Sequence, residues 1–116
     1  MPTAYKILGQ VATATLGATT EGTLYTVPSS TSTVVSSIAI TNQAASSATY
    51  RIAVQPSADA GSSAAAKHWI VYGATVAASD ATILTLGLTL ATGDRIRVYG
   101  SSATLSFSAY GSEITA

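Results

Sequence analysis

Apolar and polar residues alternate with a period of two along most of this 116-residue sequence. The segment TILTLGLTL (82–90) shows it most clearly, because leucine occupies every second position from 84 to 90. Successive side chains of a β-strand point to opposite faces, so such a segment forms a strand with one apolar and one polar face. The segments STVVSSIAI, ATYRIAVQ and ATLSFSAYG follow the same rule. The alternation therefore predicts strands that each turn one face to a core.

The alternating segments are short and are separated by turn-forming residues, which predicts about eight strands. They lie near residues 5–15, 22–27, 32–41, 48–55, 67–73, 81–90, 94–99 and 103–110. No segment between them has a convincing helical pattern. The chain length suits one domain over residues 1–116. We therefore expect an all-β fold, an antiparallel β-sandwich that is jelly-roll or Greek-key-like.

Charged residues are scarce, with five basic and five acidic side chains and a formal net charge of zero. A freely diffusing monomer usually keeps its net charge away from zero, so a neutral exterior favours a protein that packs against others. The balance also argues against nucleic acid as a partner, because binding phosphates needs several basic side chains on one face. No apolar segment approaches the roughly 18 residues of a membrane span, so we expect no membrane partner.

Residues suited to catalysis or metal binding are few. There is no cysteine, which excludes disulfides, thiolate metal sites and cysteine nucleophiles. His68 is the single histidine, and a zinc site needs further ligands. Strand alternation places His68 with Ile70 and Tyr72, and Trp69 with Val71 on the other side. The sequence has no nucleophile elbow and no phosphate-binding loop, so we expect no enzyme and no cofactor; the alternative is a hydrolase that pairs His68 with a serine.

Arg95 and Arg97 stand one residue apart in RIRVYG, so both side chains leave one face of the predicted strand, together with Tyr99. Because guanidinium groups bind carboxylates in a fork, we interpret this face as a docking patch; a solvated pair that discourages edge pairing is the alternative. If the last two strands form a hairpin, the same face carries Tyr110. The full set of candidate protein-interface residues is Tyr5, Lys6, Gln55, Asp59, Lys67, Arg95, Arg97, Tyr99 and Tyr110.

The connection QPSADAGSSAAA (55–66) is longer than a hairpin needs. It is either a functional loop or the crossing of the chain from one sheet to the other. Tyrosine is the most frequent aromatic residue, and exposed tyrosines can form a sugar-binding platform or the anchors of an interface. Tyr50 shares its predicted face with Ile52 and Val54, so we expect it in the core instead.

Six segments carry a family resemblance: YKILGQ, TLYTVP, STVVSSIAITN, ATYRIAV, GLTLATGDRIRVYG and ATLSFSAYGSEI. In this order, over nearly the whole chain, they resemble small virion structural proteins of tailed bacteriophages, above all those of cyanobacterial phages. The resemblance implies a capsid cement (decoration) protein on the exterior of the virion, without catalytic residues. Its partners would be the major capsid protein and its own copies, as a homodimer or homotrimer. The alternative is a tail- or fibre-associated module that binds a host glycan.

Overall fold

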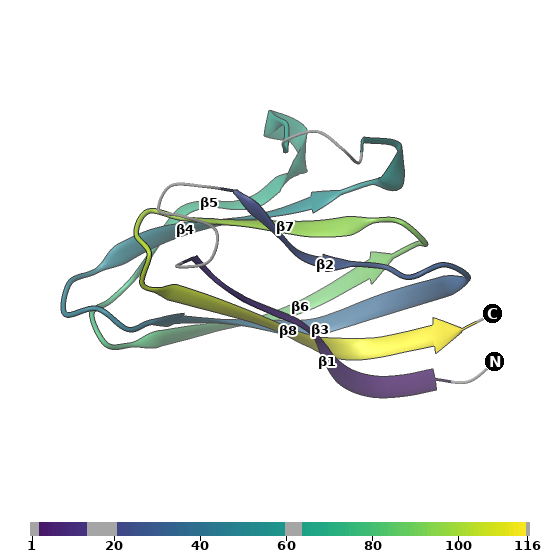
Figure 1. The fold of residues 1–116 in the computed structure, drawn as a ribbon, viewed down its shortest axis with the longest axis horizontal. Helices are drawn as coiled ribbons and strands as arrows, with labels where there is room; N and C mark the ends of the chain where they lie inside the picture. The colour runs from purple at the N-terminus through teal and green to yellow at the C-terminus, as the bar shows by residue number, and fades with distance from the viewer. Residues whose placement is uncertain (1–2, 14–20, 60–63, 116) are drawn as a thin grey trace.

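Eight strands form two four-stranded sheets that pack face to face (Figure 1). The computed structural model describes residues 3–13, 21–59 and 64–115. Sheet A has the strand order β1-β8-β3-β6 and sheet B the order β2-β7-β4-β5, with every neighbouring pair antiparallel. The strands are β1 (Thr3–Ala12), β2 (Gly22–Thr26), β3 (Thr31–Asn42), β4 (Ala48–Gln55), β5 (Trp69–Val76), β6 (Ala81–Leu90), β7 (Arg95–Gly100) and β8 (Leu105–Thr115).

This order is that of a jelly roll, in which the chain passes from one sheet to the other after almost every strand. The predicted β-sandwich is confirmed, and the strand order decides two points about its connections that the sequence left open. The 55–66 connection does not cross between sheets, because β4 and β5 are neighbours in sheet B. The strands β7 and β8 do not form a hairpin, because β8 lies inside sheet A between β1 and β3. The face of Arg95 and Arg97 therefore does not include Tyr110.

The core lies between the sheets and consists of the inward side chains of the alternating strands. Its largest fully buried members are Phe107, Ile38 and Ile40 from sheet A and Ile52 and Ile96 from sheet B. Each such side chain contributes roughly 1.5–3 kcal/mol by leaving water. Tyr50 is buried as predicted and packs edge-on against Phe107, with 6.3 Å between the ring centroids.

The start of β5 departs from the predicted alternation. Residues Ala66–His68 form a single 3₁₀ turn (η2), so His68 is not on a strand. Within β5, Val71 pairs with Ile52 and Trp69 with Ala53, which leaves Ile70 as an extra residue. This bulge brings Trp69 to the outer face, away from Val71, so the predicted grouping of these two residues is wrong. The other helical segment described is a three-residue 3₁₀ turn (η1, Ser57–Asp59), and neither turn is long enough to cross a membrane.

A buried polar network joins the two sheets. The Tyr25 hydroxyl of β2 donates a hydrogen bond to Glu113 of β8 and lies 2.8 Å from Thr33 Oγ1 of β3. Lys6 Nζ of β1 binds the other Glu113 oxygen at 2.7 Å, so this predicted interface residue forms an ion pair within the chain. The hydrogen bonds from Lys6 and Tyr25 lower the pKa of Glu113. Burial, followed by the bond to Glu113, raises the pKa of Tyr25 to about 12.

The raised pKa of Tyr25 predicts a loss of stability in alkali. The native phenol holds its proton more tightly than an unfolded one, so its contribution is complete below pH 10 and is lost as the pH rises from 10 to about 12. We expect Tyr25→Phe to lower the free energy of unfolding at pH 7 by roughly 1–3 kcal/mol, because buried Glu113 loses a donor.

Urea unfolding of both proteins between pH 7 and pH 12 measures this effect. The free energy of unfolding of Tyr25→Phe should fall less steeply above pH 10 than that of the unchanged protein. Burial also raises the pKa of Tyr50, so part of the slope remains in the variant. Tyr110→Phe is the control, because that side chain is exposed. Equal slopes for Tyr25→Phe and the unchanged protein would contradict the prediction.

Candidate functional site

The two outer faces of the sandwich differ in charge. The strands of sheet A lie entirely within the described residues and contain two charged residues, Lys6 and Glu113. Both belong to the inner side, because Glu113 pairs with buried Thr33 and Lys6 pairs with Gly111, which faces buried Val35. The outer face of sheet A therefore carries no charge, and we call it the neutral face. The outer face of sheet B carries the arginines of the chain.

Large exposed side chains interrupt the small polar residues of the neutral face. Tyr5 is 86% exposed and Ile7 54% exposed on β1, and Tyr110 is 37% exposed on β8. Ile7 pairs directly with Tyr110, so the three side chains lie on neighbouring strands. Ile83 of β6 is exposed farther along the same face. Between them lie Ser37, Ala39, Thr41, Thr85, Thr89, Ser106, Ser108 and Ser112. The predicted interface residues Tyr5 and Tyr110 are thus brought together.

Arg95 and Arg97 share the outer face of β7, as predicted, but both guanidinium groups are bonded within the chain. Arg97 Nε lies 2.8 Å from Glu21 Oε2, and its Nη1 donates to Thr23 Oγ1 at 2.7 Å. Arg95 donates from Nε and Nη2 to Oε1 of Gln55, which is fully buried. A carboxylate of a neighbouring protein would have to compete with these bonds. The geometry therefore does not favour the predicted docking patch at Arg95 and Arg97.

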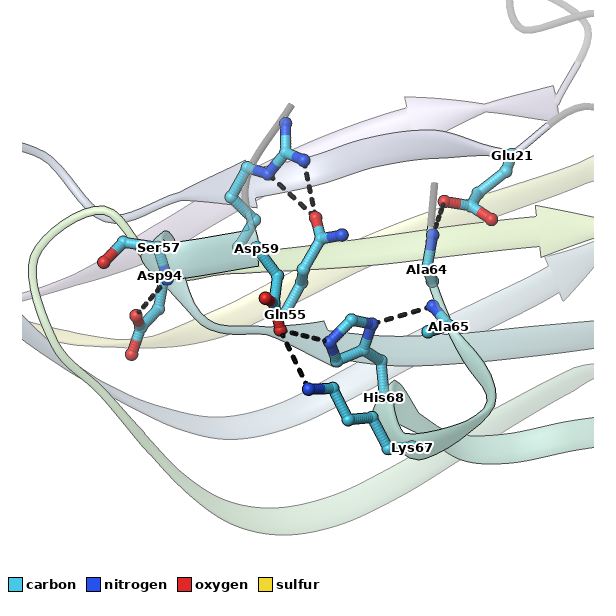
Figure 2. Close-up of polar contacts among 10 residues, drawn as sticks. Glu21, Gln55, Ser57, Asp59, Ala64, Ala65, Lys67, His68 and Asp94 are labelled. Atoms are coloured by element: carbon cyan, nitrogen blue, oxygen red, sulfur yellow. Dashed lines mark hydrogen bonds and ion pairs between the residues drawn. The ribbon is translucent and has the colours of Figure 1, made fainter. Parts of the chain in front are cut away.

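The two 3₁₀ turns between β4 and β5, η1 and η2, lie over one end of this outer face (Figure 1), where η2 packs against β4. Asp59 stands between His68 and Lys67 in Figure 2, with Oδ2 2.9 Å from His68 Nε2 and 3.5 Å from Lys67 Nζ. His68 Nδ1 accepts the backbone N–H of Ala65 at 2.8 Å. Since Nδ1 is an acceptor, the hydrogen-bond network assigns the proton of the neutral ring to Nε2, which donates it to Asp59.

This arrangement joins the two 3₁₀ turns between β4 and β5, η1 and η2, to each other. His68 is buried and both of its ring nitrogens are engaged, so neither is available to take a proton from a serine. The hydrolase alternative therefore lacks a base in this geometry. The hydrogen bond from His68, helped by Lys67, lowers the pKa of Asp59. Nowhere in residues 3–13, 21–59 and 64–115 do three acidic or histidine side chains gather as metal ligands.

A cation–aromatic cluster lies on the outer face of sheet B beside η2, because Trp69 directly follows His68. The Arg51 guanidinium carbon is 4.1 Å from the Tyr72 ring centroid and 4.3 Å from that of Tyr99. Trp69 lies 5.9 Å from the same carbon and packs edge-on against Tyr72. Among the described residues, none accepts a hydrogen bond from this guanidinium group. Tyr99 was a predicted interface residue. Arg51 pairs directly with Tyr72 and Tyr99, whereas Trp69 joins the cluster only through the bulge at Ile70, for which the sequence pattern has no signal.

Comparison with known proteins adds structural neighbours of low similarity. No protein-family model matches the sequence, and no curated protein matches it. The nucleoplasmin-like N-terminal domain of Drosophila FKBP39 is 16% identical, with a TM-score of 0.47 over 98% of this chain and 93% of that chain.

Two further neighbours come from virus structures. The VLP of extra small virus of the giant freshwater prawn Macrobrachium rosenbergii is 14% identical, with a TM-score of 0.48 over 97% of this chain and 77% of that chain. The structure of the Gt strain of infectious bursal disease virus is 11% identical, with a TM-score of 0.45 over 97% of this chain and 28% of that chain. With TM-scores below 0.5, these similarities carry no argument about function, and the assignment to tailed phages stays a prediction.

The lowered pKa of Asp59 predicts that the connection loosens in acid. The native carboxylate holds a proton less tightly than an unfolded one, so its contribution is present above about pH 4 and is lost as the pH falls below that value. We expect Asp59→Asn to reduce the hydrogen-exchange protection of the Ala65 and His68 amides already at pH 6. In the unchanged protein the same loss should appear only in acid.

Asp80→Asn is the matched control, because Asp80 accepts a hydrogen bond from Ala81 at the start of β6, far from the connection in sequence. Full protection of both amides in Asp59→Asn at pH 6 would show that the ion pair does not hold the connection.

Proposed function

We propose that this protein is a virion structural protein, a cement (decoration) protein that binds the exterior of an assembled phage capsid and bridges its major capsid protein subunits. The observation that carries the proposal is the neutral face, which has no charge over four strands and exposes Tyr5, Ile7 and Tyr110. The proposed role is binding alone, without a catalytic step or a cofactor. The family resemblance of the sequence supports the same role.

The neutral face suits a tight fit on a large body. Covering hydroxyl and methyl groups requires far less desolvation free energy than covering ions. Most of the face can therefore contact a partner with a small desolvation penalty. Large amphipathic side chains such as Tyr5 and Tyr110 supply the anchors that dominate binding energy. Exposed apolar groups that lie together mark interaction sites more often than scattered ones do.

A capsid would be stabilised by this kind of contact through mass action. A protein that binds only the assembled shell shifts the equilibrium toward that shell. Each contact can be weak, because many copies act together and an oligomer holds several subunits at once. Backbone hydrogen bonds hold the eight strands in two sheets, which makes the sandwich rigid. A rigid domain is suited to bridging neighbouring capsid subunits.

The copy number in purified particles tests the location. A cement protein should be present at about the number of shell subunits or a simple fraction of it, as measured by quantitative mass spectrometry. A few copies per particle would overturn the capsid assignment and favour the tail. Absence from the particle would overturn the virion role.

Placing a charge on the neutral face should prevent capsid binding. We expect Tyr5→Glu and Tyr110→Glu each to weaken binding to empty expanded capsids by at least about tenfold, because the new charge is buried without a partner. Thr75→Glu is the control, because Thr75 is exposed on the outer face of sheet B. Co-sedimentation with capsids measures all three. If Thr75→Glu prevents binding and the tyrosine variants do not, the contact lies on sheet B instead.

The Arg51 cluster favours a second candidate function, a tail- or fibre-associated module that binds a host glycan. Tyr72 is 64% exposed beside Trp69 and Arg51, and aromatic rings with a nearby hydrogen-bond donor form a platform for a sugar ring. A glycan array distinguishes the candidates. A glycan-binding module retains sugars and loses them in Tyr72→Ala, whereas Tyr110→Ala leaves binding unchanged. A cement protein retains none.

A further inference from the structure

Strand β6 is an edge of sheet A that lacks the usual protection against pairing. It pairs with β3 on one side, and no other described strand pairs with it. Its sequence contains no charge and no proline, although natural edge strands commonly carry one or the other. The opposite edge of the sheet, β1, has the inward-pointing Lys6 and a bulge between Ile7 and Gly9.

Three leucines at the β6 edge are only half-buried. Leu84, Leu86 and Leu88 pack against the core but retain contact with water. No charged side chain of the strand competes for the space beside them. The edge therefore offers both backbone groups and apolar surface to a further strand.

The sequence of β6 indicates which strand would fit. Residues 84–90 read LTLGLTL, the same in both directions around Gly87. If two copies of β6 pair antiparallel about a two-fold axis at Gly87, each residue meets its own type. Leu84 then lies opposite Leu90 of the second copy, and Thr85 opposite Thr89 of the second copy. Residues directly opposite share a face, so the leucines join the two cores and the threonines join the two neutral faces.

Gly87 has no explanation within one chain. A side chain at this position would meet nothing within 4 Å, and the residue is not in the left-handed conformation that favours glycine. The pairing with β3 is irregular here, since Leu86 and Gly87 face the single residue Ser36, but this irregularity does not need a positive φ. Glycine weakens a strand, and in a strand it often marks close approach of another backbone. A two-fold axis brings two backbones together at this residue.

We infer that a second copy of this chain binds along β6, antiparallel and centred on Gly87, to form a homodimer. The contact is isologous, because both copies present the same strand in the same register. Sheet A of the two copies becomes one eight-stranded sheet with an uncharged outer face. The inference does not depend on the proposed capsid role, because the dimer forms without any particle.

Charge pairs across the axis test both the contact and its register. Thr85 and Thr89 are exposed on the neutral face and lie about 14 Å apart along one strand, so charges placed there interact little within a chain. The variant with Thr85→Lys and Thr89→Lys places like charges opposite each other twice. The variant with Thr85→Lys and Thr89→Glu places opposite charges there.

Analytical ultracentrifugation of the full chain gives the dissociation constants. We expect a dimer for the unchanged protein, a dissociation constant at least about tenfold higher for the Lys/Lys variant, and a value restored to within a few-fold for the Lys/Glu variant. The control combines Thr3→Lys with Gln10→Lys, which adds the same charge on β1, where both residues are exposed; its dimer should persist. Circular dichroism confirms that each variant is folded.

Three results would overturn the inference. The first is a monomer or trimer for the unchanged protein at the highest concentration reached. The second is a Lys/Lys variant that dimerises as tightly as the unchanged protein. The third is a Lys/Glu variant that is no tighter than the Lys/Lys variant, which would exclude the register centred on Gly87.

Discussion

Burial of the inward face of each sheet against the other is the interaction on which the rest of this structure depends. It orients every strand, because a slip of one residue would turn the apolar side chains to water. Once Ile38, Ile52 and Phe107 occupy the core, their alternate neighbours have to face outward. The neutral face, the Arg51 cluster and the exposed β6 edge are all consequences of this one arrangement.

The chain keeps its few charges away from the face that we propose for docking. Glu113 turns inward and binds Tyr25 between the sheets, and the half-exposed Lys6 on the same side of sheet A pairs with it. Other charged side chains fasten segments of sheet B, with Arg97 bound to Glu21 and Asp59 holding the β4–β5 connection. These charged side chains therefore form ion pairs within the chain. The neutral face, which we propose for association, consists of hydroxyls, methyl groups and tyrosines. Such a surface favours a protein that functions when packed against others.

Sequence reasoning succeeded where the information was local. Alternation over 81–90 and 48–55 predicted β6 and β4 at the residues observed, because side-chain direction in a strand follows from position alone. It failed where the structure of a segment depends on the strand that it pairs with. The pairing of β7 with β4 instead of β8 depends on how two sheets stack, and the position of Trp69 depends on a bulge that its partner strand defines. Of the candidate site, Tyr5 and Tyr110 were predicted, whereas the bonds that occupy Arg95 and Arg97 were not.

The sequence by itself determined that this chain forms an all-strand sandwich with an almost uncharged exterior, because period-two patterning and composition act residue by residue. Only the tertiary structure decided which strands are neighbours, where the charges go and which edge is left open. These properties arise between segments far apart in the chain, such as Arg97 and Glu21 or Arg51 and Tyr99, and no local pattern records them. The LTLGLTL palindrome of residues 84–90 shows the same difference. The palindrome can be read from the sequence, but its position at an edge of sheet A is a property of the fold.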